Sequence, residues 1–287
     1  MELCVVSGKG GTGKTTVSVG LAVALAEQGD ATVRLVDCDV EAPNCHLYLN
    51  PGPVGEEPVT VLVPSWEREK CTGCGACATA CQFGSLGLFG AHLEIFTEHC
   101  HSCGVCAYVC LEGALSEMPR RIGVMRRGGV GGIELSWGLL DVGEPRAVPV
   151  IDALRRGAGG KPLVIVDGPP GTSCSMAAAA RRADVALVVT EPTPFGLHDL
   201  AGACAVLRVL GVPAGVVLNK AQGGRGPVHE YCEAQGLPLL LEIPMDRALA
   251  ESGAGGVALP AARPEYGGIL RSLWAACEGL AAGRTAP

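Results

Sequence analysis

Eight cysteines within residues 71–110 are the side chains whose type and spacing most directly predict chemistry. They form two runs with the same C-x2-C-x2-C-x3-C spacing: Cys71, Cys74, Cys77 and Cys81, and then Cys100, Cys103, Cys106 and Cys110. Thiolates are metal ligands, and clustered thiols in a reducing compartment bind metal more often than they form disulfides. This segment therefore predicts a metal-binding module.

The spacing also indicates which metal centre the module holds. It is the ligand run of bacterial ferredoxins, in which the fourth cysteine of each run binds the cluster of the other run. The predicted first [4Fe–4S] cluster has the ligands Cys71, Cys74, Cys77 and Cys110, and the predicted second cluster has Cys81, Cys100, Cys103 and Cys106. Zinc is the alternative, because paired C-x2-C also fits Zn²⁺. Gln82 and Leu111 stand where the run usually has proline, and each adds a backbone N–H that could reach a sulfur.

A second chemical motif lies upstream, where residues 8–15 read Gly-Lys-Gly-Gly-Thr-Gly-Lys-Thr. A glycine-rich loop between a strand and a helix presents backbone N–H groups to phosphates. The predicted nucleotide-binding residues of this loop are Gly8, Gly10, Gly11, Thr12, Gly13, Lys14, Thr15 and Thr16. Lys14 is expected to reach the β- and γ-phosphates and Thr15 to ligate Mg²⁺. The predicted ligands are ATP and Mg²⁺.

The elements that position these motifs follow from the apolar pattern. Short apolar strands are expected at residues 3–6, 33–36, 59–63, 163–166, 185–189, 215–218 and 239–243. Helices are expected at residues 15–28, 175–182, 197–210, 227–235 and 265–280. This alternation predicts an α/β fold, a mostly parallel sheet with helices on both faces. Residues 1–65 and 119–287 are predicted to form this P-loop NTPase domain, and residues 66–118 an inserted α+β module of the bacterial ferredoxin type.

The additional lysine of the loop, Lys9, makes it the deviant form Lys-Gly-Gly-x-Gly-Lys-Thr. Here the sequence resembles the MinD/Mrp branch of P-loop ATPases, in the superfamily of the nitrogenase iron protein. Together with the cysteine runs, nearly the whole chain resembles MinD-type ATPases that carry an inserted two-cluster ferredoxin domain. The resemblance implies that ATP favours a homodimer, and that Lys9 acts on the nucleotide of the other subunit.

The same resemblance implies roles for residues at the carboxyl ends of the predicted strands. Asp37 supports Mg²⁺, Asp39 orients the attacking water, and Asp167 holds a water ligand of Mg²⁺. Gly171 senses the γ-phosphate, and the adenine is contacted by Asn219 and Pro244. A structural turn is the alternative for Asn219 and Pro244. The residues expected to act in catalysis are Lys9, Lys14, Asp39 and Asp167.

Composition limits the partners. The net charge of −7 and the pI of about 5.4 argue against a nucleic-acid partner and against stable membrane association. No apolar stretch approaches the length of a membrane helix, and no leader pattern precedes the phosphate loop. Together with the odd number of cysteines, 15, the absence of these patterns predicts a reducing, cytoplasmic location.

Two lesser features remain open. Cys174 follows the predicted Gly171 turn, so it could share a ligand across a dimer axis or could simply begin a helix. Four arginines beside the cysteine segment could form a solvated linker face or a docking surface for an acidic redox partner: Arg120, Arg121, Arg126 and Arg127.

These motifs predict an ATP-binding and ATP-hydrolysing iron–sulfur protein. MgATP-driven switching of a dimer would be coupled to electron transfer, or to metallocluster assembly, on a client protein. Hydrolysis is expected to be slow and regulated by the partner. The alternatives are a non-catalytic iron–sulfur cluster carrier or scaffold, and a MinD-like positioning factor whose clusters sense redox state.

Overall fold

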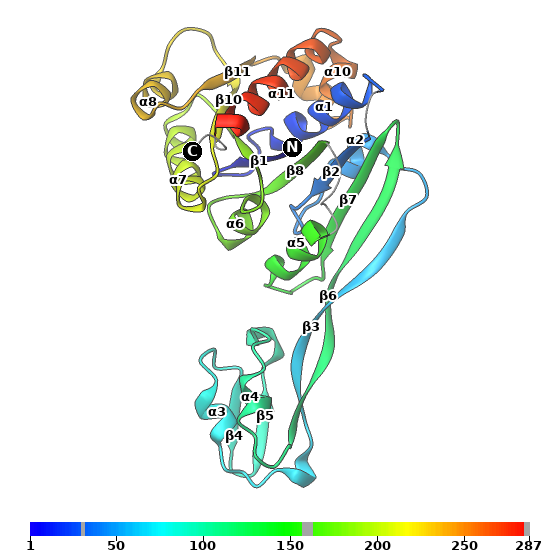
Figure 1. Ribbon diagram of the computed structural model, residues 1–287, viewed down its shortest axis with the longest axis vertical. Coiled ribbons are helices and arrows are strands. Elements are labelled where there is room, and N and C mark those ends of the chain that lie inside the picture. Colours follow the sequence, from blue (N-terminus) through cyan, green and yellow to red (C-terminus); the bar gives the residue numbers. More distant parts are fainter. Residues whose placement is uncertain (30–31, 157–162, 284–287) are drawn as a thin grey trace.

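The computed structural model describes residues 1–29, 32–156 and 163–283. Figure 1 shows a body of sheet and helices from which a long two-stranded ribbon extends. The cysteine-rich segment lies at the far end of that ribbon. No helix in the described ranges is both long enough and apolar enough to cross a membrane.

The body is built on a sheet of nine strands in the part of the chain that the structure describes. Their order across the sheet is β11-β10-β9-β1-β8-β2-β7-β6-β3. The strands are β1 (Glu2–Ser7), β2 (Val33–Asp37), β3 (Gly55–Trp66), β6 (Leu115–Val130), β7 (Ile133–Leu140), β8 (Leu163–Pro170), β9 (Val185–Thr190), β10 (Ala214–Ala221) and β11 (Leu239–Pro244). Pairing is parallel from β11 to β7 and antiparallel only between β7, β6 and β3. The predicted mostly parallel sheet is therefore confirmed.

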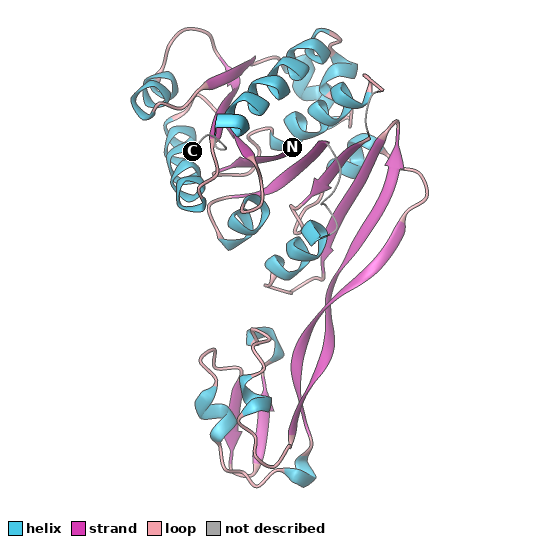
Figure 2. Cartoon of the chain, viewed as in Figure 1, coloured by secondary structure: helices cyan, strands magenta, loops and turns pink. Residues whose placement is uncertain are grey.

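Helices cover both faces of the sheet, and each face has its own aliphatic core (Figure 2). One face carries α1 (Lys14–Ala26), α2 (Cys45–Leu49), α10 (Leu259–Ala262) and α11 (Glu265–Gly283). The other carries α5 (Ala147–Arg156), α6 (Cys174–Ala180), α7 (Pro194–Leu210) and α8 (Pro227–Gln235). The short helix α9 (Arg247–Ala254) follows β11. Because the central strands are apolar on both sides, they pack only when both faces are covered.

The ribbon consists of β3 and β6, paired antiparallel from Gly55–Arg127 to Trp66–Leu115. The sequence predicts only residues 59–63 of it, because the outer residues are polar and alternate poorly. The backbone pairing continues through these polar residues, and ion pairs lie across the two strands: Arg126 binds Glu56 at 2.8 Å and Arg127 binds Glu57 at 3.1 Å. The register shifts between Val59 and Thr60, opposite Ile122, which is the kind of bulge that bends a strand.

The cysteine-rich segment contains short elements only. They are the 3-10 turns η1 (Arg68–Lys70) and η2 (Thr97–His99), the helices α3 (Ala76–Ala80) and α4 (Val105–Tyr108), and the hairpin of β4 (Leu86–Phe89) and β5 (His92–Ile95). Its buried apolar core is small, formed by Leu86, Leu93 and Leu115 with partly buried cysteines around them. Such a core cannot by itself stabilise a module of this size, so a further source of stability is needed.

Several boundaries differ from those predicted. The strand β8 continues to Pro170, so Asp167 lies within a strand rather than after it. Helix α7 begins at Pro194, not at residue 197, because Thr193 accepts the backbone N–H of Gly196 and proline suits the first turn. The strands β6 and β7 and helix α5 were not predicted, since Gly, Pro and paired arginines interrupt their apolar pattern.

Candidate functional site

The phosphate loop is held open by glycine geometry and by a contact from β10, which lies two positions from β1 in the sheet. The loop between β1 and α1, with the first turn of α1, contains all the predicted phosphate-binding residues: Gly8, Gly10, Gly11, Thr12, Gly13, Lys14, Thr15 and Thr16. Gly13 has φ +100°, and a Cβ there would lie 2.3 Å from Nδ2 of Asn219. That amide donates a hydrogen bond to the carbonyl of Thr12 at 2.7 Å. Asn219 thus stabilises the backbone of the loop through this hydrogen bond. Its contact with adenine stays a prediction.

Two buried aspartates lie below the loop. Asp37 and Asp167 are direct partners in the pairing of β2 with β8. The Asp167 carboxylate accepts hydrogen bonds from Thr15 Oγ1 at 2.7 Å and from Ser18 Oγ at 2.8 Å. Asp37 accepts backbone N–H bonds from Asp39, Asn44 and Cys45. These contacts connect the helix that carries Thr15 to the start of the Asp39 loop.

The electrostatics of this group favour a cation. Burial raises the pKa of Asp37 to about 7, and the neighbouring Asp167 carboxylate adds to the rise. Burial also raises the pKa of Asp167 and, against the nearby Lys14 ammonium, raises that of Asp39 to about 6. A divalent cation bound at Thr15 would offset this cost by stabilising the ionised carboxylates.

Two residues of this group, Ser18 and Cys45, were not predicted from sequence. The Cys45 thiol is buried and donates to Asp167 Oδ2 at 3.5 Å. Possible ligand atoms of Asp37, Cys45 and Asp167 all lie within 4.8 Å of one another. No spacing motif joins these three residues, so only the fold brings them together.

Lys9, the lysine expected to act across a dimer, is bound within its own chain. Its Nζ lies 2.9 Å from Glu191 Oε2, and Lys220 pairs with the other carboxylate oxygen. Although burial opposes ionisation, hydrogen bonds from Lys220 and Lys9 hold the pKa of Glu191 below its usual range. Glu191 lies directly after β9, and no sequence motif indicated it as a site residue.

A cavity of about 200 Å³ opens beside the loop. Its lining includes Gly11, Thr16, Asn219 and Pro244, so the structure brings the residues predicted for adenine next to those predicted for phosphate. Gly171 lies on the other side of β1, where its N–H donates to the carbonyl of Ser7 at 3.0 Å. The cavity is therefore adjacent to the loop on the side of β10 and β11.

The eight clustered cysteines line two separate cavities. The first, of about 160 Å³, is lined by Cys71, Cys74, Cys77 and Cys110. The second is narrower, about 20 Å³, and is lined by Cys81, Cys100, Cys103 and Cys106. Each cavity thus combines three cysteines of one run with the last cysteine of the other, which is the crossed arrangement of two-cluster ferredoxins.

Backbone amides are directed at several of these sulfurs. Ser85 N–H contacts Cys81 Sγ at 3.3 Å, Ser102 N–H contacts Cys100 Sγ at 3.4 Å, and Ala114 N–H contacts Cys110 Sγ at 3.3 Å. The donor set of each cavity, four thiols with N–H donors to sulfur, is that of a [4Fe–4S] cluster, and the second cavity would have to widen to hold one. The sequence indicated the N–H groups of Gln82 and Leu111, which directly follow Cys81 and Cys110. The N–H contacts to these two sulfurs come from Ser85 and Ala114, four positions after each cysteine.

The arginines beside the cysteine segment do not form a free cationic surface. Each is paired with a carboxylate: Arg120 with Glu144, Arg121 with Asp141, Arg126 with Glu56 and Arg127 with Glu57. The hypothesis of a docking surface for an acidic partner is therefore weakened, because these charges are already compensated. Cys174 is exposed and begins α6.

A comparison with known families adds to this geometry. Residues 3–259 match the model of the CobQ/CobB/MinD/ParA nucleotide binding domain. The chain belongs to this family. An uncharacterised protein of Methanocaldococcus jannaschii is 35% identical over 225 residues, which are 77% of this chain and 78% of that protein. An iron–sulfur cluster carrier protein of Aquifex aeolicus is 26% identical over 278 residues, which are 92% of this chain and 62% of the carrier.

Solved structures agree on the fold. The septum site-determining protein MinD of Pyrococcus horikoshii, in complex with Mg-ADP, superposes with a TM-score of 0.60 and 21% identity, covering 100% of this chain and 99% of that one. The chain is thus a MinD-like P-loop nucleotide-binding protein with iron–sulfur carrier relatives, as the sequence predicted.

Proposed function

We propose that this MinD-like protein uses MgATP binding and hydrolysis, with closure of a homodimer, to control electron delivery from two [4Fe–4S] clusters to a client protein. The observation that carries the proposal is the pair of four-cysteine cavities at the end of a ribbon that grows out of the nucleotide-binding sheet. A redox module and a nucleotide site within one chain are most simply explained if one controls the other.

Electrons are a better cargo than the clusters themselves because the module depends on its metal. Its apolar core is small, with Leu86, Leu93 and Leu115 as the buried centre, and each cavity takes its last cysteine from the other run. Releasing a cluster would therefore remove one of the two links between the halves of the module and weaken it. When bound, such clusters accept and release single electrons. Cys74 and Cys103, one from each cavity, are exposed, which leaves a short path from each site to a docked partner.

On the nucleotide side, the proposed roles follow the geometry. Lys14 and the loop N–H groups hold the phosphates, Thr15 ligates Mg²⁺, and Asp167 orients Thr15 through their 2.7 Å hydrogen bond. Asp39 directs water to the γ-phosphate, giving ADP and phosphate. Lys9 leaves Glu191 and reaches the nucleotide of the second subunit, so dimer closure requires the 2.9 Å pair to break.

The test is anaerobic. Iron and sulfide analysis with EPR determines the clusters, and the rate of electron transfer from the dithionite-reduced protein to a low-potential acceptor is measured with and without MgATP. A MgATP-dependent rate with retained iron supports the proposal. Zinc in place of iron, or a rate that ignores MgATP, would contradict it.

A cluster carrier is the second candidate, because the Aquifex aeolicus relative is an iron–sulfur cluster carrier protein. The exposed Cys174 at the start of α6 would then be an additional ligand at a dimer interface. This function predicts that MgATP promotes transfer of iron and sulfide to an apo-ferredoxin. Iron that stays with the chain throughout turnover excludes it.

A further inference from the structure

An arginine connects the nucleotide-binding body directly to the second cysteine site. Arg146 immediately precedes α5, and its Nη1 donates to the carbonyl oxygen of Cys100 at 2.6 Å. The same guanidinium binds Glu144 through Nε at 2.5 Å and Nη2 at 3.0 Å. Both side chains are largely buried, with 12% of Arg146 and 2% of Glu144 exposed. Arg146 therefore forms a shielded contact between residues 46 positions apart in the chain.

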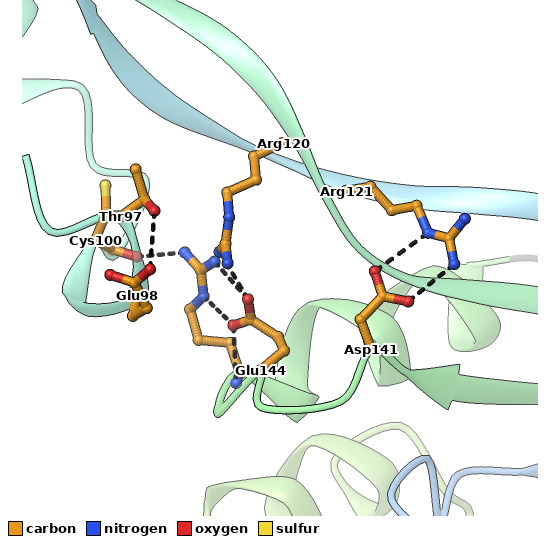
Figure 3. A network of polar contacts seen from close by, with 8 residues as sticks. Thr97, Glu98, Cys100, Arg120, Arg121, Asp141 and Glu144 are labelled. Atoms are coloured by element: carbon orange, nitrogen blue, oxygen red, sulfur yellow. Dashed lines mark hydrogen bonds and ion pairs between the residues drawn. The ribbon is translucent and has the colours of Figure 1, made fainter.

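The carboxylate of Glu144 fixes this arginine to the ribbon as well. Figure 3 shows Glu144 beside Arg120 of β6, which donates to its Oε2 at 2.7 Å. Asp141 binds Arg121 with both carboxylate oxygens, at 2.9 and 3.2 Å, and its backbone N–H donates to the carbonyl of Ile122. Residues 141–146, here called the junction loop, are thus held to the ribbon at the bulge near Ile122.

The other side of the junction loop touches the proposed nucleotide switch. Leu140, the last residue of β7, donates its N–H to the carbonyl of Val40 at 2.9 Å, and Val40 follows Asp39. Ala147 of α5 lines a cavity of about 70 Å³ together with Asp39 and Pro169. The segment after β2 therefore contacts β7, which precedes the junction loop, through Val40. Asp39 and Pro169 of β8 share a cavity with Ala147 of α5, which follows the junction loop.

We infer that Arg146 is a positioning residue that transmits the nucleotide state to the second cluster site. The inference rests on the proposed function. A shift of the Asp39 loop on MgATP binding moves Leu140 and the start of α5, and the junction loop, being tied to the ribbon, passes that shift to the Cys100 carbonyl. The guanidinium charge beside a ligand cysteine favours the reduced, more negative form of the site, so its displacement lowers the reduction potential there.

The test uses the full-length, cluster-loaded protein with the substitutions Arg146→Gln and Arg146→Lys. Arg126→Gln is the matched control, because Arg126 lies on the same ribbon and pairs with Glu56 away from the cysteines. EPR-monitored redox titration gives the potential of each cluster with and without MgATP. Hydrogen exchange of residues 97–103 in the same samples reports the junction independently of redox activity.

Arg146→Gln is expected to lower the potential of the second site without nucleotide, to raise exchange of residues 97–103, and to abolish the MgATP-induced change. Arg146→Lys keeps the charge and should restore part of both effects, while Arg126→Gln should behave as wild type. If wild type responds to MgATP and Arg146→Gln responds equally, the inference is wrong and the proposed function stands. If wild type itself shows no response, the proposed function fails, and the inference fails with it.

Discussion

Gly138 lies on β7 beneath α5, at a point where the structure leaves no room for a side chain. A Cβ at this position would lie 2.7 Å from Val150 Cγ1, 2.8 Å from Val40 Cγ1 and 3.1 Å from Leu154 Cδ1. All three neighbours are at most 1% exposed, so none can swing into solvent. In Gly138→Ala the helix and the Val40 segment must therefore shift, and overpacking of this kind costs about 1–3 kcal/mol.

For a chain of this size, 1 kcal/mol corresponds to about 2–4 °C in the melting temperature. We therefore expect Gly138→Ala to melt roughly 2–12 °C below wild type in far-UV circular dichroism. Gly129→Ala is the control, because its added Cβ would make only an ordinary 3.5 Å contact with the carbonyl of Ile133. A Gly138→Ala protein that melts with wild type would refute the described packing of α5 on β7 and Val40.

Three further predictions concern the sites themselves. Since burial raises the pKa of Asp39 to about 6, the rate of ATP hydrolysis should fall as the pH drops through that value. Asp39→Asn should remove hydrolysis, while calorimetry still detects ATP binding. Equal hydrolysis rates above and below pH 6 would argue against Asp39 as the residue that directs the attacking water. Glu191→Gln should free Lys9 and stabilise the MgATP-dependent dimer by up to about 1 kcal/mol per subunit, measured by sedimentation. Lys9→Ala should prevent formation of this dimer. If both variants dimerise as wild type does, Lys9 does not act across the interface. Cys110→Ala should remove the EPR signal of the first cluster and leave that of the second cluster unchanged. If Cys110→Ala removes the signal of the second cluster instead, the crossed ligation is wrong. Cys174→Ala should leave the iron content unchanged.

The parts of the molecule that sequence could predict are those encoded by local pattern. The apolar runs at β1, β2 and β8 specify buried parallel strands, because both faces of each strand meet helices. The grouping of Cys110 with Cys71 follows from the spacing of the runs and the crossed ligation of ferredoxins, so it needed no tertiary information.

What sequence could not predict depends on contacts between distant residues. The ribbon extends well beyond its apolar centre through polar residues such as Arg126 and Glu56, which meet across the strands, and neither charge indicates a strand by itself. The pairing of Lys9 with Glu191 and the bond from Arg146 to the Cys100 carbonyl likewise join residues far apart in the chain. Local sequence periodicity does not predict such pairs, because their partners come together only when the strands have assembled in their order in the sheet.

The central claim is that nucleotide binding changes the state of the iron–sulfur module. The midpoint reduction potential of the clusters, titrated anaerobically with and without MgATP, tests it most directly, with Lys14→Ala as the protein whose phosphate loop is impaired. We expect a shift on MgATP addition in wild type and none in Lys14→Ala. Identical potentials in wild type with and without MgATP, in a sample that calorimetry shows to bind the nucleotide, would contradict it.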